Sequence, residues 1–310
     1  MVTGRFAPTP SGRMHLGNLF CALLAWLSAR SQNGKIVLRI EDLDRDRSRR
    51  EFAEQTERDL SFLGLTWDEG GLRSAGYCQS ERSAYYQELL ERLNRKGLLY
   101  PCFCTRAELH AAAAPHASDG DVIYSGKCRG LTPGQVEALS KQRAPALRLR
   151  VPDETLSVTD GHFGGYSQNL LRECGDFILR RSDGVFAYQL AVTADDAAMG
   201  VTEVVRGRDL LSSTPRQVYL YGLLGFEPPR FDHTPMLLAE DGRRLSKRDR
   251  DVSLEALAEK GYSAEDIVGR LGYLAGLLDR PEPAVAKDLV GVFRWDKVPK
   301  EDIRLPEGLF

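Results

Sequence analysis

One short segment near the start of the chain, residues 5–18, decides the fold, and it reads RFAPTPSGRMHLGN. Phe6 and Ala7 end an apolar stretch at about residues 3–7, which predicts a short buried strand. Two prolines, a serine and a glycine follow, and they predict a tight turn that interrupts regular structure. Residues 16–30 are then nearly all apolar and predict a buried helix. The segment therefore predicts a strand, a turn and a helix in immediate succession.

This turn has the features of a nucleotide-binding loop. The first N–H groups of a helix lack partners within the helix, so they suit a phosphate. His15 stands where its imidazole is expected to donate to phosphate oxygens, and Gly17 leaves room for a base or a ribose close to the backbone. The alternative is an ordinary strand-to-helix turn with a capping histidine. On this segment alone, the alternative is favoured.

A second segment, residues 242–249, reads GRRLSKRD and changes that balance. It is basic, and its Ser246 and Lys247 are placed to reach a triphosphate, although charged runs are more often solvated surface. The two segments together resemble the signature pair of class I aminoacyl-tRNA synthetases, a His-x-Gly-Asn motif and a Lys-Met-Ser-Lys-Ser-like loop. The resemblance implies that ATP is held by His15, Gly17, Asn18 and Lys247, with His15, Ser246 and Lys247 acting in catalysis.

Further motifs resemble the glutamyl branch of that class, and the resemblance covers about residues 3–250. They are the segment at 5–12, IEDLD at 40–44, and the stretch from 188 that ends in VVRGRD at 204–209. Glutamate carries an ammonium and two carboxylates, so its pocket needs an anion and cations. The resemblance assigns the glutamate site to Arg5, Phe6, Ala7, Pro8, Thr9, Glu41, Tyr188 and Arg206.

Within this set, Glu41 is expected to bind the ammonium and the two arginines the carboxylates. The alternative for Glu41, Asp42 and Asp44 is a solvated acidic loop that pairs with Arg45 and Arg47. Because the other glutamyl-type motifs accompany it, Glu41 is assigned to the glutamate site, whereas Asp42 and Asp44 are not.

The segment after residue 248 is expected to be too short for the helical anticodon-binding region of a glutamyl-tRNA synthetase. The pattern resembles the glutamyl-Q tRNA(Asp) synthetases, which activate L-glutamate with ATP and transfer it to the queuosine base of tRNA(Asp). Mg²⁺ is expected to accompany the ATP. Two alternatives stay open: a glutamyl-tRNA synthetase catalytic domain that charges a tRNA 3′-terminal ribose, and a non-catalytic paralogue that binds glutamate or the adenylate.

Composition sets the broad class. The chain has 310 residues, of which 42% are hydrophobic and 28% charged, as is usual for a globular protein with a sizeable core. Its formal charge of −2 argues against holding nucleic acid by bulk electrostatics, so RNA must be bound by local patches. The sequence shows neither an apolar run long enough for a membrane span nor the features of a signal peptide. A cytoplasmic monomer is expected.

The organisation along the chain predicts an α/β fold, with a Rossmann-like parallel sheet as its core. Helices are expected at 50–65 and 80–97, covering the sheet, and a strand at 146–151. Residues 1–99 and 185–250 are expected to form the two halves of the core. An inserted α+β subdomain that meets the acceptor is expected at 100–184, and a short helical region at 251–310, with helices that start at Ser253 and Ser263.

Three cysteines inside the insert predict a structural zinc site, namely Cys102, Cys104 and Cys128, because thiolate clusters in a reducing compartment favour zinc over disulfides. Relatives with this insert use a tyrosine four residues before the last cysteine, and Tyr124 matches it. His110 and His116 remain alternatives for the fourth ligand. Three free cysteines without a metal remain the other interpretation, because Cys-x-Cys is shorter than most zinc spacings.

Overall fold

The computed structural model describes residues 1–105, 107–108, 123–245 and 253–310. Its first elements are β1 (Thr3–Phe6), α1 (Leu16–Ser31) and β2 (Lys35–Leu38). β1 and β2 pair in parallel, with Thr3 opposite Lys35 and Phe6 opposite Leu38. The predicted strand, turn and helix are therefore confirmed, and β3 (Glu69–Gly70) extends the same sheet in parallel beyond β2.

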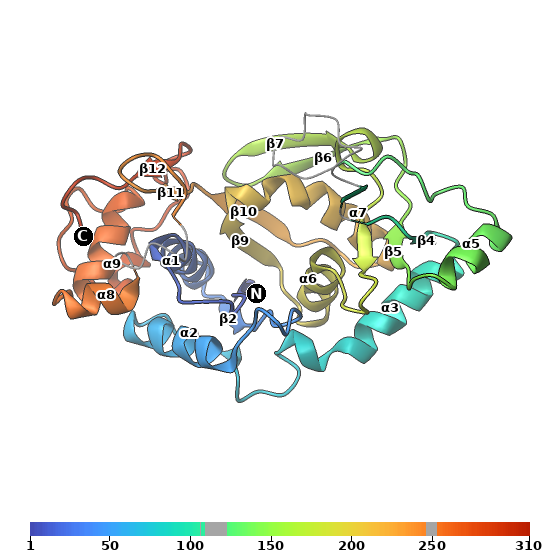
Figure 1. Ribbon diagram of the computed structural model, residues 1–310. Coiled ribbons are helices and arrows are strands. Elements are labelled where there is room, and N and C mark those ends of the chain that lie inside the picture. The colour runs from blue at the N-terminus through green and yellow to red at the C-terminus, as the bar shows by residue number, and fades with distance from the viewer. Residues whose placement is uncertain (106, 109–122, 246–252) are drawn as a thin grey trace.

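The second half of the chain continues this layer on the other side of β1. β9 (Glu203–Gly207) lies beside β1, where the Thr202 N–H donates to the Thr3 carbonyl at 2.9 Å. β10 (Arg230–Thr234) pairs in parallel with β9 over the whole length of both strands. Figure 1 shows the two strands side by side near the middle of the molecule. The expected α/β fold with a parallel core sheet is confirmed, and the carboxyl ends of these strands meet at one edge.

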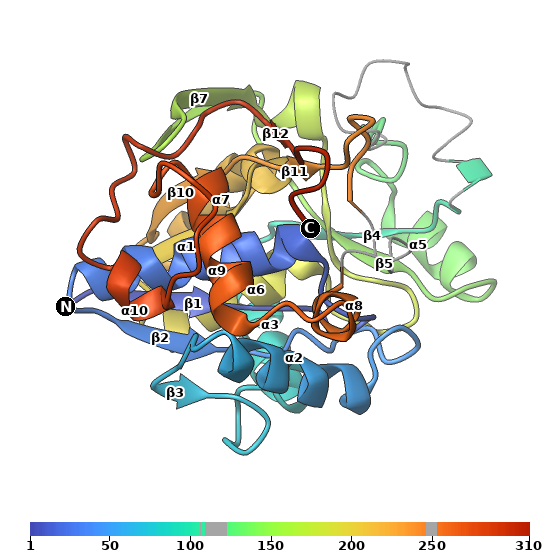
Figure 2. The same ribbon diagram turned by 90° about the vertical axis from the view of Figure 1, so that its left-hand side faces the viewer.

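α1 is buried because apolar side chains surround it. Most of its residues belong to the larger hydrophobic core, together with α9 (Ala264–Leu274) and α10 (Ala286–Leu289). Figure 2 shows these C-terminal helices packed over α1, with α8 (Leu254–Glu259) beside them. The predicted helix starts are confirmed: the Ser253 hydroxyl accepts from the N–H of the residue three positions on, and Ser263 forms a capping box.

The two helices expected over the sheet pack in different places. α2 (Arg50–Phe62) shares the core of α1 and β2. α3 (Ser83–Arg95) lies instead in a second core with α6 (Tyr188–Ala198) and α7 (Thr214–Leu224). In this second core, Tyr86 packs beside buried leucines of the same helix and meets Phe186 edge to face, with the ring centres 5.4 Å apart.

The region expected as an insert, about residues 100–184, holds two small antiparallel units. The first is a sheet of β4 (Leu99–Cys102), β5 (Ala146–Leu149) and β8 (Ile178–Arg180), and β5 confirms the strand expected there. The second is the hairpin of β6 (Thr155–Asp160) and β7 (Gly164–Asn169), whose β6 pairs with β10 of the core sheet. The hairpin is therefore tied directly to the strands that carry the candidate site.

The remaining elements are short. They are η1 (Gln79–Glu81), α5 (Pro133–Ser140), η2 (Leu170–Cys174), η3 (Arg208–Ser213), β11 (Leu237–Leu238) and β12 (Ile303–Arg304). Among the described residues, no helix combines the length and the apolar character needed to cross a bilayer.

Candidate active site and metal site

A cavity of about 590 Å³ opens at the carboxyl edge of β1, β9 and β10. This is where ligands bind in open parallel sheets. The eight residues predicted for glutamate all line it: Arg5, Phe6, Ala7, Pro8, Thr9, Glu41, Tyr188 and Arg206. So do His15, Gly17 and Asn18 from the start of α1, and Arg244 and Leu245, the two residues before Ser246. Ser246 and Lys247 themselves lie outside the described residues.

At one end of the cavity, the start of α1 is a capping box built by His15. Its Nδ1 accepts from the Gly17 N–H at 3.1 Å, and the Asn18 side chain accepts from the His15 N–H at 3.2 Å. A neutral imidazole that accepts at Nδ1 carries its hydrogen on Nε2. The capping histidine and the nucleotide-binding histidine are therefore compatible, because the cap fixes which nitrogen can donate.

Gly17 is needed for this arrangement. A Cβ added at this position would lie 3.0 Å from Cε1 of His15, a tighter contact than most Cβ atoms make. The imidazole would then have to move. The absence of a side chain at Gly17 therefore allows His15 to take this position. This role comes in addition to the space for a ribose or base that the sequence predicts.

At the other end of the cavity, Glu41 is buried and held by a buried arginine. Arg39, with none of its side chain exposed, donates from Nη2 to Glu41 at 3.0 Å and from Nη1 to Asp196 at 2.6 Å. Burial raises the pKa of Glu41, and the charge of Arg39 opposes that rise. Arg5 joins the same group, with its Nε 3.8 Å from the Asp196 carboxylate. The carboxylate of Glu41 thus faces the cavity from a fixed, charge-balanced setting.

Asp42 and Asp44, which follow Glu41, do not belong to the cavity but form contacts elsewhere. Asp44 pairs with Arg47 at 3.7 Å and with Arg181 at 3.4 Å, and Arg47 is 74% exposed. Asp42 accepts instead from Ser80. Only Glu41 of this group lines the cavity, as the sequence indicated.

Arg206, on β9, is 4% exposed. Its guanidinium donates to His233 at 3.0 Å, to Gln217 at 2.7 Å and to Thr214 at 2.9 Å. Tyr188, the first residue of α6, lines the cavity as well, and burial raises the pKa of its phenol, so the hydroxyl stays protonated. Tyr188 and Arg206 therefore both lie on the lining of the cavity, where the resemblance assigns them.

The residues that hold the site were not identified from the sequence. Arg39 stands in an apolar strand-like segment, His233 is one of several polar residues of its strand, and the sequence assigns no role to Asp195 and Asp196. Asp195 accepts from Gln79, Arg82 and Tyr86 and so connects α6 to α3. Their partners are more than a hundred positions away for both aspartates, so no local pattern marks them.

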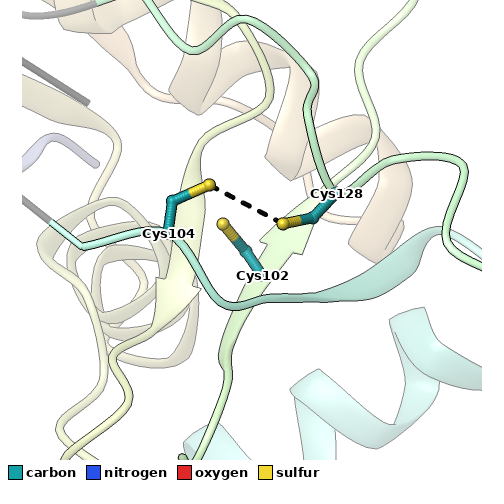
Figure 3. Close-up of side chains that lie close together, drawn as sticks. All are labelled: Cys102, Cys104 and Cys128. Atoms are coloured by element: carbon teal, nitrogen blue, oxygen red, sulfur yellow. Dashed lines mark hydrogen bonds between the residues drawn. The ribbon is translucent and has the colours of Figure 1, made fainter. Parts of the chain in front are cut away.

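The three cysteines of the insert meet in one cluster, shown in Figure 3. Their sulfur atoms all lie within 4.8 Å of one another, and Sγ of Cys104 is 3.7 Å from Sγ of Cys128. Tetrahedral zinc with Zn–S bonds of about 2.3 Å separates its sulfur ligands by about 3.8 Å. All three are free thiols. The cluster is therefore consistent with a metal site.

Tyr124 completes the geometry around the sulfurs. Its Oη lies 3.6 Å from Sγ of Cys102 and 4.0 Å from Sγ of Cys104, and it accepts from the Cys128 N–H at 2.7 Å. The alternatives His110 and His116 lie outside the described residues.

Comparisons with known proteins agree with this site. Residues 1–278 match the family of class I tRNA synthetases (E and Q), catalytic domain. A glutamyl-Q tRNA(Asp) synthetase of Symbiobacterium thermophilum is 50% identical over 313 aligned positions, which cover 99% of this chain and 96% of that protein. Its counterpart from Nitratidesulfovibrio vulgaris is 48% identical, over 100% of this chain and 97% of that protein. A solved glutamate tRNA ligase from Elizabethkingia meningosepticum, in complex with its amino acid, superposes with a TM-score of 0.85 at 29% identity, covering 99% of this chain and 68% of that one.

Proposed function

Because the chain belongs to the glutamyl-Q tRNA(Asp) synthetase family, within the class I tRNA synthetases, we propose that it activates L-glutamate with ATP and transfers it to the queuosine base of tRNA(Asp). The observation that carries the proposal is the cavity itself. It joins the start of α1, where His15 is oriented to donate from Nε2 to phosphates, to a buried set of one anion and two cations that matches glutamate. A reaction with tRNA and ATP implies the cytoplasm, and a monomer suffices because one chain supplies the whole cavity.

Glutamate is bound at the charged end of the cavity. Glu41 takes the ammonium, and Arg5 and Arg206 take the carboxylates, because each charge is then paired in a site shielded from water. Tyr188 contributes a hydroxyl, and the first turn contributes the backbone of residues 6–9.

Activation needs no side-chain nucleophile. The α-carboxylate of glutamate attacks the α-phosphorus of ATP in line, a new P–O bond forms, and the bond to pyrophosphate breaks. His15 donates to the phosphates from Nε2, while Ser246 and Lys247 stabilise the charge that develops on the leaving pyrophosphate. The roles of Ser246 and Lys247 rest on the sequence motif, and Mg²⁺ accompanies the nucleotide.

Transfer then follows from the adenylate. A hydroxyl of the queuosine base attacks the activated carbonyl, an ester forms, and AMP leaves with the bonding electrons. The protein positions the two reactants for this step.

Zinc is the metal proposed for the cysteine cluster. Three thiolates suit zinc by their softness, and a four-coordinate site formed by Cys102, Cys104, Tyr124 and Cys128 leaves no open position, which is typical of structural sites. The metal would join β4 to the segment around Tyr124 and so stabilise the insert. A phenolate ligand is supported by the placement of the Tyr124 oxygen beside two of the sulfurs.

The test incubates purified protein with ATP, labelled glutamate and tRNA(Asp) that either carries or lacks queuosine. Label found only on the queuosine-containing tRNA is the expected result. Label on the terminal ribose of tRNA(Glu) would make the protein a charging enzyme, the reaction named for the similar Elizabethkingia ligase. Absence of glutamate-dependent pyrophosphate exchange would leave only a binding role.

A further inference from the structure

We propose that Asp160 and His233 position Arg206 for glutamate, by holding the His233 ring in the single tautomer that accepts a hydrogen bond from the guanidinium. The inference rests on the proposed function, in which Arg206 binds a carboxylate of glutamate. Asp160 and His233 do not line the cavity and so act through Arg206, as positioning residues.

The three side chains form one buried row. Nδ1 of His233 is 2.6 Å from Oδ2 of Asp160, and Nε2 of the same ring lies 3.0 Å from Nε of Arg206. Asp160 is 2% exposed, His233 is fully buried and Arg206 is 4% exposed. Water therefore cannot substitute for any bond of the row.

The chemistry of the row permits one arrangement of hydrogens. An arginine Nε always carries a hydrogen, so the nitrogen that faces it must present a lone pair. The hydrogen of the neutral ring is then on Nδ1, where the carboxylate of Asp160 accepts it. Burial lowers the pKa of His233 to about 4, so the ring is neutral near neutral pH.

Asp160 is itself held in place by the hairpin that carries it. Its Oδ1 accepts from the backbone N–H groups of His162 at 3.0 Å and Phe163 at 2.8 Å. The carboxylate thus cannot turn away from His233 without losing two bonds. Through this residue, the β6–β7 hairpin reaches the amino-acid end of the core cavity.

The hydrogen bonds of Arg206 determine which of its N–H groups remains for a ligand. Its guanidinium has five N–H groups. Four are used within the described part of the chain: one on His233, one on Gln217, and two on Thr214 and the Leu210 carbonyl, the last at 3.3 Å. The fifth, on Nη1, is left for a ligand. Fixing the guanidinium in this way before binding reduces the entropy lost when glutamate binds.

Asp160→Asn is the sharpest test. The amide group can donate to Nδ1 of His233, which would move the ring hydrogen to Nε2. The Nε2–H of the ring and the Nε–H of Arg206 would then point at each other. The expected result in glutamate-dependent pyrophosphate exchange is a KM for glutamate raised roughly 10- to 100-fold, the size of a lost hydrogen bond to a charged group, with the KM for ATP unchanged. His233→Gln, whose carbonyl oxygen can accept from Arg206, is expected to keep a lower KM for glutamate than His233→Leu.

Asp232→Asn is the matched control. Asp232 is the neighbour of His233 on β10, is fully buried, and binds Arg230 rather than Arg206. A general effect of removing a buried carboxylate from this region would raise the KM for glutamate in both variants equally, and that result would overturn the proposal.

A second measurement reads the tautomer of His233 directly in the wild-type protein. In wild-type protein labelled with ¹⁵N-histidine, His233 is expected to show a protonated Nδ1 and an unprotonated Nε2, with its signals assigned by their loss in His233→Gln. A hydrogen on Nε2 would overturn the proposal even if Asp160→Asn does not fold. Failure of the proposed function would look different: the wild type would show no glutamate-dependent exchange, or Arg206→Lys would leave the KM for glutamate unchanged, while the tautomer stayed as expected.

Discussion

The two ends of the cavity are built in opposite ways. The phosphate end is local: His15, Gly17 and Asn18 are neighbours in the chain and bond to one another. The amino-acid end is non-local, since Glu41 depends on Arg39 and through it on Asp196, which is 157 positions from Arg39. A local site needs only a turn and a helix start, whereas a buried ionic site needs the whole fold. The difference predicts that changes at the two ends affect different kinetic constants.

The largest effect is expected at the phosphate end, from Lys247→Ala. Loss of a cation that stabilises the leaving pyrophosphate should lower kcat of glutamate-dependent exchange about 100- to 1,000-fold, because the interaction is made in the transition state. Lys287→Ala removes an exposed lysine of α10 and serves as the control, with unchanged exchange. Full exchange by Lys247→Ala would remove the basic loop from the mechanism.

Glu41→Gln should give the next largest effect, at the amino-acid end. The amide keeps the shape but not the charge, so the ammonium of glutamate loses its anionic partner and the hydrogen bond from Arg39 to this position is no longer charge-assisted. We expect the KM for glutamate to rise roughly 10- to 100-fold with little change in the KM for ATP. Asp42→Asn, at the next position but bonded to Ser80, is the control. A change in the KM for ATP as large as that for glutamate would contradict the separation of the two ends.

The same division explains what could be predicted from the sequence. The strand, turn and helix of residues 3–31 and the helix starts at Ser253 and Ser263 follow from local propensity and capping, and the structure confirms them. His233 is 27 positions from Arg206 and 73 from Asp160, so no periodicity or spacing connects the three.

Arg39 is a second residue whose role could not be predicted from the sequence. It stands in the apolar run KIVLRI, where a charged residue would ordinarily be expected to reach solvent. Its complete burial becomes understandable only with Glu41, Asp195 and Asp196 around it, and two of these come from α6. Pairs of this kind are formed by tertiary packing and leave no local signal.

A smaller effect is expected from Gly17→Ala, again at the phosphate end. The new Cβ would displace the imidazole of His15, so the KM for ATP should rise about tenfold, the loss of one hydrogen bond, while the KM for glutamate stays the same. Gly222→Ala in α7 is the matched control, because a Cβ there meets nothing within 4 Å. An unchanged KM for ATP would mean that His15 acts only as a helix cap.

The smallest effect on activation is expected from loss of the proposed zinc, whose three cysteines do not line the cavity. Cys104→Ser should abolish bound zinc, measured by elemental analysis, and lower the Tm, because a structural metal stabilises the folded state of its ligands. Glutamate-dependent exchange should stay within about twofold of wild type, since distant sites act independently. Transfer to tRNA should fall further than exchange, because the insert is expected to meet the acceptor. Cys174→Ser, outside the cluster, should keep its zinc. A parallel loss of exchange and transfer in Cys104→Ser would show that the region around the cluster supports the cavity itself.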